Sequence, residues 1–321
     1  MTQPEISIRL MVYNHGKYLE DAFEGIFSQK VNVPYEVVVG NDFSNDNSAS
    51  IITKYQKKYP DIVRVLEREG NQEYISKRKK GSHLVNFYDI LKNCRGKYVA
   101  ILDGDDFWCD ESKLQKQYDF LEQNKNVSLC YTGVKILNDE TNEITYYDFV
   151  NKSNYIQDFN SYLRNYEPTP SATMFFRNNL TYNNSFEKTF CSAFLGDYAL
   201  RFFLGNIGDF GFLSENTAVY RKHDAGLSGV TAIKSIDIER RLNCNKTLYN
   251  HFKPEYKWFL KRPNPKLQEQ YIYALLLEKK FLKALIKFPH TLYGDNYKPR
   301  KLKDLIVLVK SCLKIIIHNQ T

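Results

Sequence analysis

The sequence predicts an α/β fold in which a mainly parallel sheet is flanked by helices and followed by a C-terminal helical extension. In the first third of the chain, short apolar runs alternate with segments whose apolar residues recur every three or four positions. The connections between them are short and rich in Asn, Asp, Ser and Gly. Such alternation of strands and helices builds parallel sheets that are covered on both faces.

Four strands are predicted in this first part, because each is an apolar run that ends in a polar turn. They cover 6–13, 35–40, 62–66 and 97–102. Helices are predicted from Leu19, from near Ser48 and over 84–91, where apolar residues recur at helical spacing. The polar, basic stretch 70–81 is predicted to be a mobile loop.

The second half of the chain is less regular. Its predicted strands are short and cover 127–131, 172–176 and 218–220. A helix is predicted over 197–204. Beyond Ser235 only helical patterns remain, and the last of them covers 302–317. We therefore place a boundary between residues 234 and 235.

Composition restricts the class of protein. The chain has 321 residues, of which 43% are hydrophobic and 26% charged, and this is ordinary for a folded domain. Neither a signal peptide nor a transmembrane helix is expected, since no basic stretch precedes a long apolar run and no window of about 18 residues is uninterruptedly apolar. The six cysteines form no C-x-x-C pair, which favours reduced thiols in the cytoplasm over a zinc site or a disulfide framework.

The net charge of +8 is unevenly distributed. Residues 251–321 contain 15 Lys and Arg against 5 Asp and Glu, a net charge of +10, which leaves −2 for residues 1–250. A weakly acidic body with a basic tail differs from a protein that is basic throughout for nucleic acid. Nucleic acid is therefore not expected as a partner.

Three carboxylates lie within four residues at the end of the predicted strand 97–102: Asp103, Asp105 and Asp106. Like charges this close repel, and a fold tolerates them when a cation or several hydrogen-bond donors compensate. Divalent cations prefer oxygen ligands and often bridge carboxylates to phosphates. The alternative is an acidic turn that caps the following helix, and the motif alone does not choose between the two. An EF-hand is excluded, because the twelfth residue from Asp103 is Leu114 rather than Glu.

Three further polar residues each have a structural alternative. Asp42 follows a predicted strand and can cap the helix near Ser48. Asp197 lies at the start of a predicted helix, where a lone Asp is more often a cap than a catalytic base. A lone histidine such as His223 is usually structural, but the Gly-rich stretch 225–229 beside it favours a loop that can approach a ligand.

Taken together and in order, five segments of the chain resemble bacterial-type glycosyltransferase family 2 enzymes of the GT-A fold. The segments are 6–19 with its Tyr13-Asn14 pair, 36–46, 96–108 with its Asp-x-Asp motif, 195–198 and 220–223. The resemblance runs from about Ile6 to Gly229, and the agreement after the acidic motif continues over 113–117. One position departs from the pattern. The first acid of the usual pair is Asn41 here, which leaves Asp42 as the residue expected to contact the nucleobase.

The resemblance implies an inverting transfer of a sugar from a nucleotide-sugar, with a UDP-sugar as the default donor. It implies that a divalent cation, Mn²⁺ or Mg²⁺, is held by Asp105 and His223 and stabilises the leaving diphosphate. Asp197 is then the general base that takes the proton of the acceptor hydroxyl. The remaining residues implied for the donor site are Tyr13, Asn14, Asp42, Asp103, Asp106 and Arg221.

The same resemblance gives the parts of the chain their expected roles. Residues 1–234 form the GT-A domain, with a nucleotide-binding half at 1–110 and an acceptor half at 111–234, and residues 235–321 form a basic helical C-terminal region. The expected acceptor is a hydroxyl of a glycan or a lipid-linked molecule in cell-surface polysaccharide synthesis. The transferred sugar is expected to be a hexose or an N-acetylhexosamine.

Two other functions fit parts of the sequence. A nucleotidyltransferase also uses paired carboxylates and a metal, but it usually needs a Gly-rich basic loop after the first strand, and the stretch 13–17 contains a single Gly. A non-catalytic nucleotide-sugar-binding module would keep Asp42 and Asp103 while having no need of Asp197.

The basic tail has two interpretations. Apolar residues recur at helical spacing among lysines in its last predicted helix: Leu302, Leu305, Ile306, Val309, Leu313 and Ile316, with Lys303, Lys310 and Lys314. Such a helix can pack on its own body or on another subunit of a homo-oligomer. It can also bind the inner face of the cell membrane as a peripheral anchor, with its lysines on anionic head groups.

Overall fold

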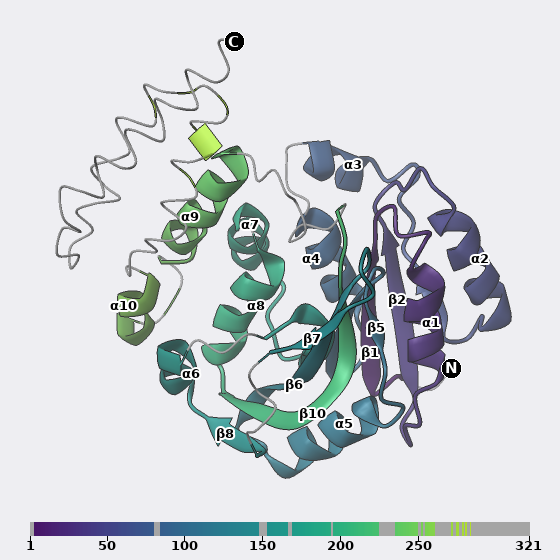
Figure 1. Ribbon diagram of the computed structural model, residues 1–321, viewed down its shortest axis with the longest axis horizontal. Helices are drawn as coiled ribbons and strands as arrows, with labels where there is room; N and C mark the ends of the chain where they lie inside the picture. The colour runs from purple at the N-terminus through teal and green to yellow at the C-terminus, as the bar shows by residue number, and fades with distance from the viewer. Residues whose placement is uncertain are drawn as a thin grey trace.

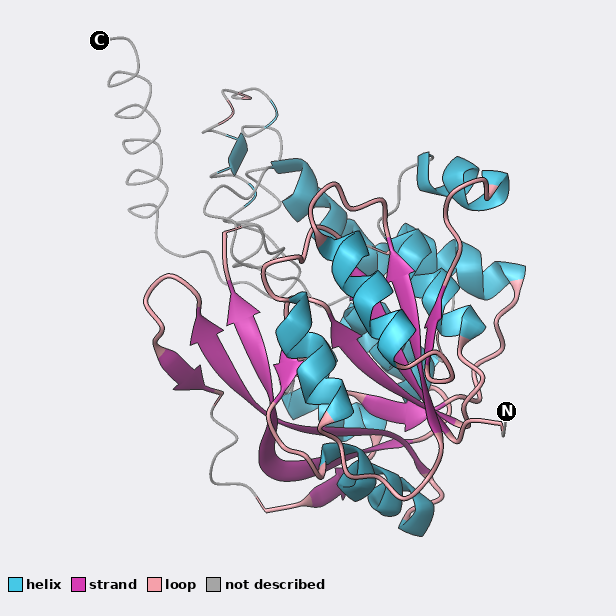
Figure 2. Cartoon of the chain, turned by 90° about the vertical axis from the view of Figure 1, so that its right-hand side faces the viewer, coloured by secondary structure: helices cyan, strands magenta, loops and turns pink. Residues whose placement is uncertain are grey.

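The structure is a computed structural model, and it describes most of the residues up to Tyr249. The described residues are 3–79, 84–147, 153–165, 169–193, 195–224, 235–249, 252, 254–260, 271, 274, 275, 278, 280 and 283. They form a curled ten-stranded sheet with helices on both faces (Figure 1). Figure 2 shows the strands between these helices. The predicted α/β class is therefore confirmed.

The first half of the sheet is parallel, in the order β3-β2-β1-β4. Its strands are β1 (Ile6–Val12), β2 (Tyr35–Asn41), β3 (Val63–Val65) and β4 (Tyr98–Asp103). The two central strands are almost wholly buried, because helices cover both of their faces. This explains why they read as continuous apolar runs. At the centre of the register, Leu10 of β1 pairs with Val39 of β2 and Leu102 of β4.

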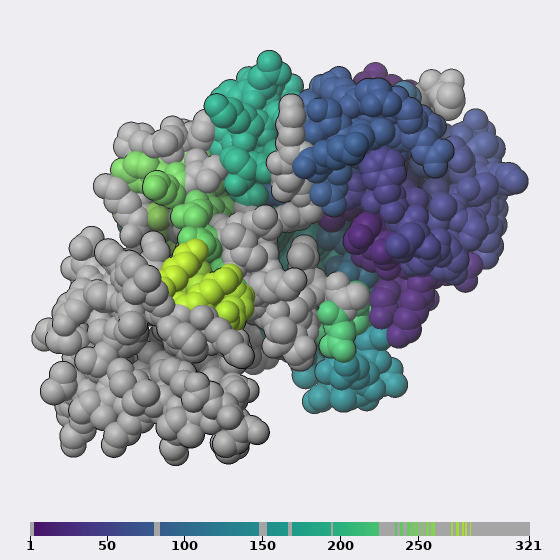
Figure 3. Space-filling model, turned by 90° about the horizontal axis from the view of Figure 1, so that it is seen from above, coloured from purple at the N-terminus to yellow at the C-terminus, as the bar shows by residue number. Residues whose placement is uncertain are grey.

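Helices cover the two faces of this half with separate apolar clusters. On one face α1 (Leu19–Phe27) and α2 (Ser48–Lys58) pack with the strands, and the rings of Phe23 and Tyr55 stack at 4.2 Å between centroids. On the other face lies α4 (Leu84–Asn93). In the space-filling view, this N-terminal half forms one side of the visible face, in purple and blue (Figure 3).

The second half of the sheet is mixed. Its strands are β5 (Phe107–Trp108), β6 (Val127–Asn138), β7 (Ile144–Tyr146), β8 (Tyr155–Gln157), β9 (Phe175–Arg177) and β10 (Asp209–Lys222). Strand β9 lies antiparallel between β4 and β6. Among the described strands, four pairings are parallel and five antiparallel. The parallel arrangement predicted for the sheet thus holds for its first half.

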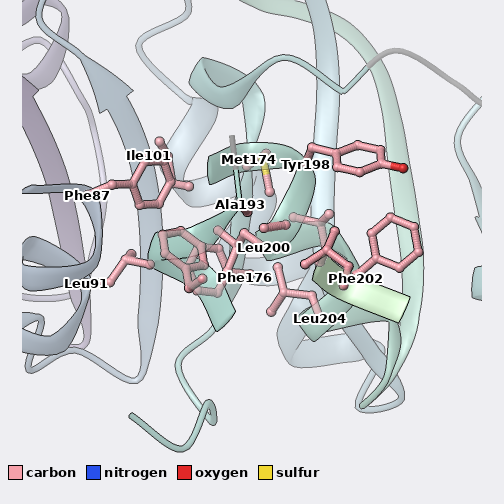
Figure 4. Packing of buried hydrophobic residues seen from close by; sticks show 14 of the residues in the cluster. Phe87, Leu91, Ile101, Met174, Phe176, Ala193, Tyr198, Leu200, Phe202 and Leu204 are labelled. Atoms are coloured by element: carbon pink, nitrogen blue, oxygen red, sulfur yellow. The ribbon is translucent and has the colours of Figure 1, made fainter. Parts of the chain in front are cut away.

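Among the described residues, five further helices follow in this part of the chain. They are α5 (Lys113–Gln123), α6 (Phe159–Asn165), the short η1 (Ser171–Thr173), α7 (Asn184–Ser192) and α8 (Gly196–Gly205). Residues of α8, such as Leu200, join an apolar cluster with Phe87 of α4 and Ile101 of β4 (Figure 4). The cluster is rich in Phe and Tyr, which explains part of the 15% of the chain that is aromatic. It fixes α8 to the first half of the sheet.

Strands β6 and β10 are much longer than the sequence predicts. They span 12 and 14 residues and run side by side. Their register shifts between Leu213 and Asn216 and again before Ala218. Such bulges add unpaired residues to a strand and break the alternation of apolar and polar residues. Because polar residues of β10 lie at this irregularity, the sequence pattern does not show that the strand continues through it.

The prediction of a mobile loop over 70–81 is wrong for the residues that the structure describes there. Helix α3 (Gln72–Lys79) forms in this stretch. Its sequence has no apolar stripe, so periodicity could not reveal it. The helix is held by polar contacts in place of an apolar face: Tyr74 and Arg78 both donate to Asp42. A polar tertiary contact thus stabilises a helix that the local pattern does not indicate.

The C-terminal region begins with α9 (Ser235–Tyr249), η2 (Pro254–Tyr256) and α10 (Lys257–Leu260), which lie on the α7 and α8 side of the molecule (Figure 1). The predicted helix at 302–317 lies outside the described residues. No helix within the described part of the chain has the length and apolarity needed to cross a bilayer.

A buried lysine fixes α5 beneath the sheet. Lys113 is fully buried, donates to Gln117 and lies 4.7 Å from the centroid of the Trp108 ring. Gln117 in turn donates to the carbonyl oxygen of Thr173 at 2.9 Å, so the pair connects α5 to η1. Burial lowers the pKa of Lys113 from 10.5 to about 7.

This pKa predicts how stability changes with pH. Above pH 7 the folded Lys113 is largely neutral, while the unfolded side chain keeps its proton until its ordinary pKa of 10.5. Unfolding therefore takes up a proton in this window, and raising the pH stabilises the folded state. Between pH 7 and 9, wild type should gain about 2 kcal/mol in free energy of unfolding relative to Lys113→Met. Urea unfolding of both chains at the two pH values measures this, and parallel pH profiles would contradict it.

Candidate active site

The carboxyl ends of β1, β2 and β4 meet at one edge of the sheet. Val12 at the end of β1 pairs with Asn41 of β2, and Met11 pairs with Asp103 of β4. The loop after β1, the turn after β2 and the acidic segment after β4 therefore start side by side. Parallel α/β sheets bind ligands at this edge, so three of the predicted segments come together where a site is expected.

A buried cation holds Asp103. Arg9 of β1 is fully buried, and its Nη1 donates to Asp103 Oδ1 at 2.6 Å. The Arg9 guanidinium also lies 3.6 Å from the centroid of the Phe87 ring. Ser171 Oγ donates to the second Asp103 oxygen at 3.2 Å. The protein itself thus neutralises one carboxylate of the acidic segment.

Asp105 faces two imidazoles. His223 Nε2 lies 3.2 Å and His15 Nε2 lies 3.7 Å from the same oxygen, Asp105 Oδ2. Burial acts to raise the pKa of the Asp105 carboxyl, but the hydrogen bond with His223 and the proximity of His15 outweigh it. The pKa of Asp105 is therefore held below its ordinary value, so Asp105 is an anion at neutral pH.

A hydrogen bond between Arg221 of β10 and Asp106 joins β10 to the acidic segment. Asp106 is buried, and its Oδ1 accepts the backbone N–H of Arg221 at 2.9 Å. Burial, followed by the charge of Asp105, raises the pKa of Asp106 well above its ordinary value. The Arg221 side chain donates to Asp21 of α1 at 2.8 Å. The predicted donor contacts of Asp106 and Arg221 stay predictions, and the contacts seen here position β10.

The loop after β1 is fastened to the turn after β2. Asn14 has a φ of 53°, in the left-handed region that Asn tolerates. Its N–H donates to Ser44 Oγ, and its Oδ1 accepts the N–H of Asn45, both at 2.9 Å. Asn41 accepts the Ser44 hydroxyl at 2.6 Å, so the residue that departs from the family pattern has a structural contact. Tyr13 is 53% exposed at this edge.

Both oxygens of Asp42 are engaged by α3. Tyr74 Oη donates to Oδ1 at 2.8 Å and Arg78 Nε donates to Oδ2 at 2.7 Å. Asp42 does not cap α2, since the N–H of Ser48, the first residue of that helix, donates to Asp46 Oδ1 at 3.0 Å. The predicted contact of Asp42 with a nucleobase stays a prediction. For that contact to form, the Asp42 carboxylate must accept an additional hydrogen bond or lose those from Tyr74 and Arg78 of α3.

Asp197 lies in the first turn of α8 with a side chain that is 32% exposed, and its carboxylate is 3.5 Å from Arg201. After burial, the charge of Asp197 is the next cause that raises the pKa of Tyr147. Burial raises the pKa of Tyr220, and the charges of Asp106 and Asp105 and then Tyr147 act in the same direction. The charge of Asp197 thus acts on Tyr147, and the charges of the acidic segment act on Tyr220.

A continuous chain of contacts connects the start of α8 to the acidic segment. A Cβ atom at Gly196 would lie 2.9 Å from side-chain atoms of Leu84 and Phe87, so the end of α8 packs directly on α4. Phe87 contacts the Arg9 guanidinium, and Arg9 binds Asp103. The position of Asp197 is thereby tied to that of the acidic segment.

The structure adds residues that the sequence analysis missed. Tyr18 packs against the His223 ring at 4.8 Å between centroids, and its hydroxyl donates to Asp139 at 2.8 Å. Arg9 and His15 contact the acidic segment directly. An arginine inside an apolar strand was a usable signal for Arg9, because a buried charge needs a partner. Nothing local pointed to Asp139.

Much of the chain also matches a known protein family. The family model "Glycosyl transferase family 2" matches residues 7–188, which is more than half of the chain.

The chain belongs to this family.

The glycosyltransferase is similar to several relatives over part of its length. It is 33% identical to the uncharacterized protein Rv1520 of Mycobacterium tuberculosis over 132 residues, which cover 41% of the chain and 36% of that relative. It is 29% identical to the poly(ribitol-phosphate) beta-glucosyltransferase of Bacillus spizizenii over 123 residues, or 38% of the chain and 18% of that relative. The match thus spans about a third or less of these two relatives.

Solved structures show the same fold. S. aureus TarS 1–349 in complex with UDP-GlcNAc superposes with a TM-score of 0.55 at 17% sequence identity, covering 87% of this chain and 81% of that chain. Its complex with UDP gives a TM-score of 0.54 at 16% identity, covering 89% and 90%. The GT-A fold of the glycosyltransferase is therefore confirmed.

The residues around Asp105 fit a divalent cation in part. Among the residues that the structure describes, no three His, Cys, Asp or Glu side chains form a closed metal site. However, a carboxylate and an imidazole about 2.1 Å from one ion, at right angles to each other, are about 3 Å apart. The 3.2 Å between Asp105 Oδ2 and His223 Nε2 matches this spacing. An ion held by these two residues would leave positions open for phosphate oxygens.

Replacing Asp105 tests this assignment. Asp105→Asn should abolish turnover of the glycosyltransferase and leave its fold intact, because the site loses an anionic oxygen ligand. Turnover and Mn²⁺ affinity measure the effect, and circular dichroism checks the fold. The control is Asp119→Asn, at an exposed position of α5 whose carboxylate accepts only from Gln115 among the described residues. Wild-type turnover of Asp105→Asn with metal present would show that Asp105 does not hold the cation.

Proposed function

We propose that this glycosyltransferase transfers a sugar from a UDP-sugar to a hydroxyl of a glycan or lipid-linked acceptor, with inversion at the anomeric carbon. Two relatives support a role in cell-surface polysaccharide synthesis by name, the poly(ribitol-phosphate) beta-glucosyltransferase and the minor teichoic acid biosynthesis protein GgaB of Bacillus subtilis. The complexes of TarS with UDP-GlcNAc and UDP support a uridine nucleotide and an N-acetylhexosamine or hexose.

One observation carries the proposal. The acidic segment that would face the donor diphosphate is joined to the helix of Asp197 through Arg9 and Phe87. A direct displacement needs the leaving group and the base in one fixed arrangement, since the base must act while the glycosidic bond breaks. The packed contact path supplies that rigidity.

The chain's own residues would divide the chemistry. A divalent cation at Asp105 and His223 would supply Lewis-acid stabilisation of the diphosphate that leaves. Asp197 would remove the proton of the acceptor hydroxyl as the hydroxyl oxygen bonds to the anomeric carbon. A single displacement of this kind inverts that carbon. Because both Asp103 oxygens accept from Arg9 and Ser171, Asp103 is expected to shape the donor site while staying neutralised.

The uridine is expected beside the turns after β1 and β2. Tyr13 and Phe43 are both exposed there, at 53% and 45%. Exposed aromatic rings stack on flat, amphipathic ligands such as nucleobases. Asp42 lies next to Phe43, and its carboxylate would accept from the base once α3 shares it. The acceptor would enter on the side of Asp197.

Two alternative functions are weaker. Membership of glycosyl transferase family 2 favours sugar transfer over nucleotidyl transfer. A non-catalytic binding module would have no need of Asp197. Hydrolysis of nucleotide sugars distinguishes an enzyme from a binding module. The full chain is incubated with Mn²⁺ and a panel of nucleotide sugars, and only an enzyme releases the nucleotide diphosphate.

A substitution of Asp197 distinguishes a loss of catalysis from a loss of donor binding. Asp197→Asn should bind UDP-sugar and Mn²⁺ as wild type does but transfer sugar more slowly, by on the order of a hundredfold, because the amide cannot take the proton. Rates of transfer and donor affinities of both chains measure this. The control is Asp158→Asn, which alters a carboxylate that caps α6 through Ser161. Loss of donor affinity without a separate rate defect would make Asp197 a structural residue.

We also propose that the C-terminal tail binds the inner face of the cell membrane from the cytoplasm. The proposal rests on the net charge of +10 over 251–321 and on the apolar spacing within 302–317. Each lysine near an anionic surface contributes about 1 kcal/mol, and this attraction is screened by salt. Lipid-linked acceptors would be available at that surface.

Vesicle binding tests the tail. The full chain should co-sediment with anionic vesicles at low salt and much less at high salt or with neutral vesicles. Replacing Lys303, Lys310 and Lys314 by Glu should weaken binding to anionic vesicles by tenfold or more, at about 1 kcal/mol per lysine. Equal binding of both chains would remove the lysines from this role. A change in oligomeric state measured by light scattering would instead assign the tail to contacts between subunits.

A further inference from the structure

His15 lies at the site without a part in the chemistry above. It follows Tyr13 and Asn14 in the loop after β1, and its side chain is only 16% exposed. Its Nε2 atom lies 3.7 Å from Asp105 Oδ2, which is too long for a hydrogen bond. The imidazole is thus directed at the acidic segment without being satisfied by it.

Three consecutive backbone N–H groups around His15 already have hydrogen-bond partners. The N–H groups of Asn14, His15 and Gly16 donate to Ser44 Oγ, Ser48 Oγ and Asp46 Oδ2, at 2.9, 3.0 and 2.8 Å. Loops of this kind often bind phosphate through free backbone N–H groups. Here three consecutive N–H groups are occupied, so these three are not available to an anion and a side-chain donor is needed at this point of the loop.

The ring is held against the glycine of the acidic motif. A Cβ atom at Gly104 would lie 2.9 Å from His15 Nδ1, so only a glycine lets the ring approach this closely. The carbonyl oxygen of His15 accepts from the N–H groups of Tyr18 and Leu19 at 2.8 and 2.9 Å. Position and orientation of the imidazole are therefore set before any ligand binds.

The buried nitrogen determines which role the ring can take. Nδ1 of His15 is buried and has no hydrogen-bond partner in the part of the chain that the structure describes. A histidine that binds a metal through Nε2 carries its proton on Nδ1 and normally donates it to a second group. An unpaired buried N–H is costly. The ring is better accommodated with its proton on Nε2, where it faces the site as a donor.

We propose that His15 binds the diphosphate of the nucleotide donor by donating its Nε2–H to a phosphate oxygen. The inference rests on the proposed function, because it takes a nucleoside diphosphate as the ligand. Asp105 and His223 would hold the cation, and the diphosphate bound to that cation would bring an anionic oxygen within reach of His15. His15 and His223 thus face the same carboxylate but serve different ligands.

Three substitutions of His15 test the proposal. In His15→Gln the terminal amide can reach the position of Nε2, whereas in His15→Asn it reaches only the position of Nδ1. His15→Phe keeps a flat ring without a donor. The control is Glu20→Gln, which removes a surface ion pair between Glu20 of α1 and Lys54 of α2. Calorimetry on the full chain gives the affinity for Mn²⁺ alone and for UDP with Mn²⁺, with GDP as a second nucleotide.

We expect His15→Phe and His15→Asn to weaken UDP binding by about tenfold or more, since a hydrogen bond to a charged group is lost. We expect His15→Gln to stay within about threefold of wild type, and the affinity for Mn²⁺ alone to be unchanged in every variant. The same pattern with GDP is expected wherever GDP binds, because the phosphates are shared.

Other results would overturn the proposal in distinguishable ways. Wild-type UDP affinity in His15→Phe would show that the ring does not contact the diphosphate. Loss of affinity for Mn²⁺ alone would make His15 a metal ligand. A wild-type chain that binds neither nucleotide would overturn the proposed function and this inference together. Should His15→Phe fail to fold, His15→Met takes its place, because Met matches the length of Gln without an N–H donor, and a loss of UDP affinity in Met that Gln avoids comes from the donor.

Discussion

The buried ion pair between Arg9 and Asp103 is the contact on which the arrangement of the site depends. It joins neighbouring parallel strands at the edge where ligands bind, and Arg9 also contacts Phe87 of α4. Removing one partner would leave the other charge buried and unpaired, which costs several kcal/mol in proteins. The pair therefore fixes the acidic segment against the sheet and against the helix layer that positions α8.

Around this pair, the protein itself satisfies much of the acidic segment. Asp103 is neutralised by Arg9, and Asp106 accepts the backbone N–H of Arg221. Asp105 is the carboxylate that remains charged, between two imidazoles. Each of the three adjacent carboxylates thus has its own partners, and these contacts offset the repulsion expected between them.

The parts of the structure that the sequence predicted are those determined by local pattern. The strands at 6–13 and 97–102 are buried on both faces, so their apolar runs are continuous and their ends fall within about a residue or two of β1 and β4. Strand β10 was largely missed because register shifts interrupt its pattern. Helix α3 was missed because polar contacts with Asp42 stabilise it. Among the site residues, His15 was missed because it is recognised by its close approach to Gly104 in the folded structure. No spacing in the sequence indicates that approach.

The bond between Asp106 and the Arg221 amide joins positions 115 residues apart. A ribosome that synthesises the chain from its N-terminus completes the strands β1 to β4 long before β10 exists. Until β10 emerges, the buried carboxyl of Asp106 lacks this donor, and Asp105 lacks His223. Contacts of such large sequence separation form late. The nascent parallel half therefore holds an acidic segment without its partners, and the two side chains proposed to hold a cation come together only when β10 has joined the sheet.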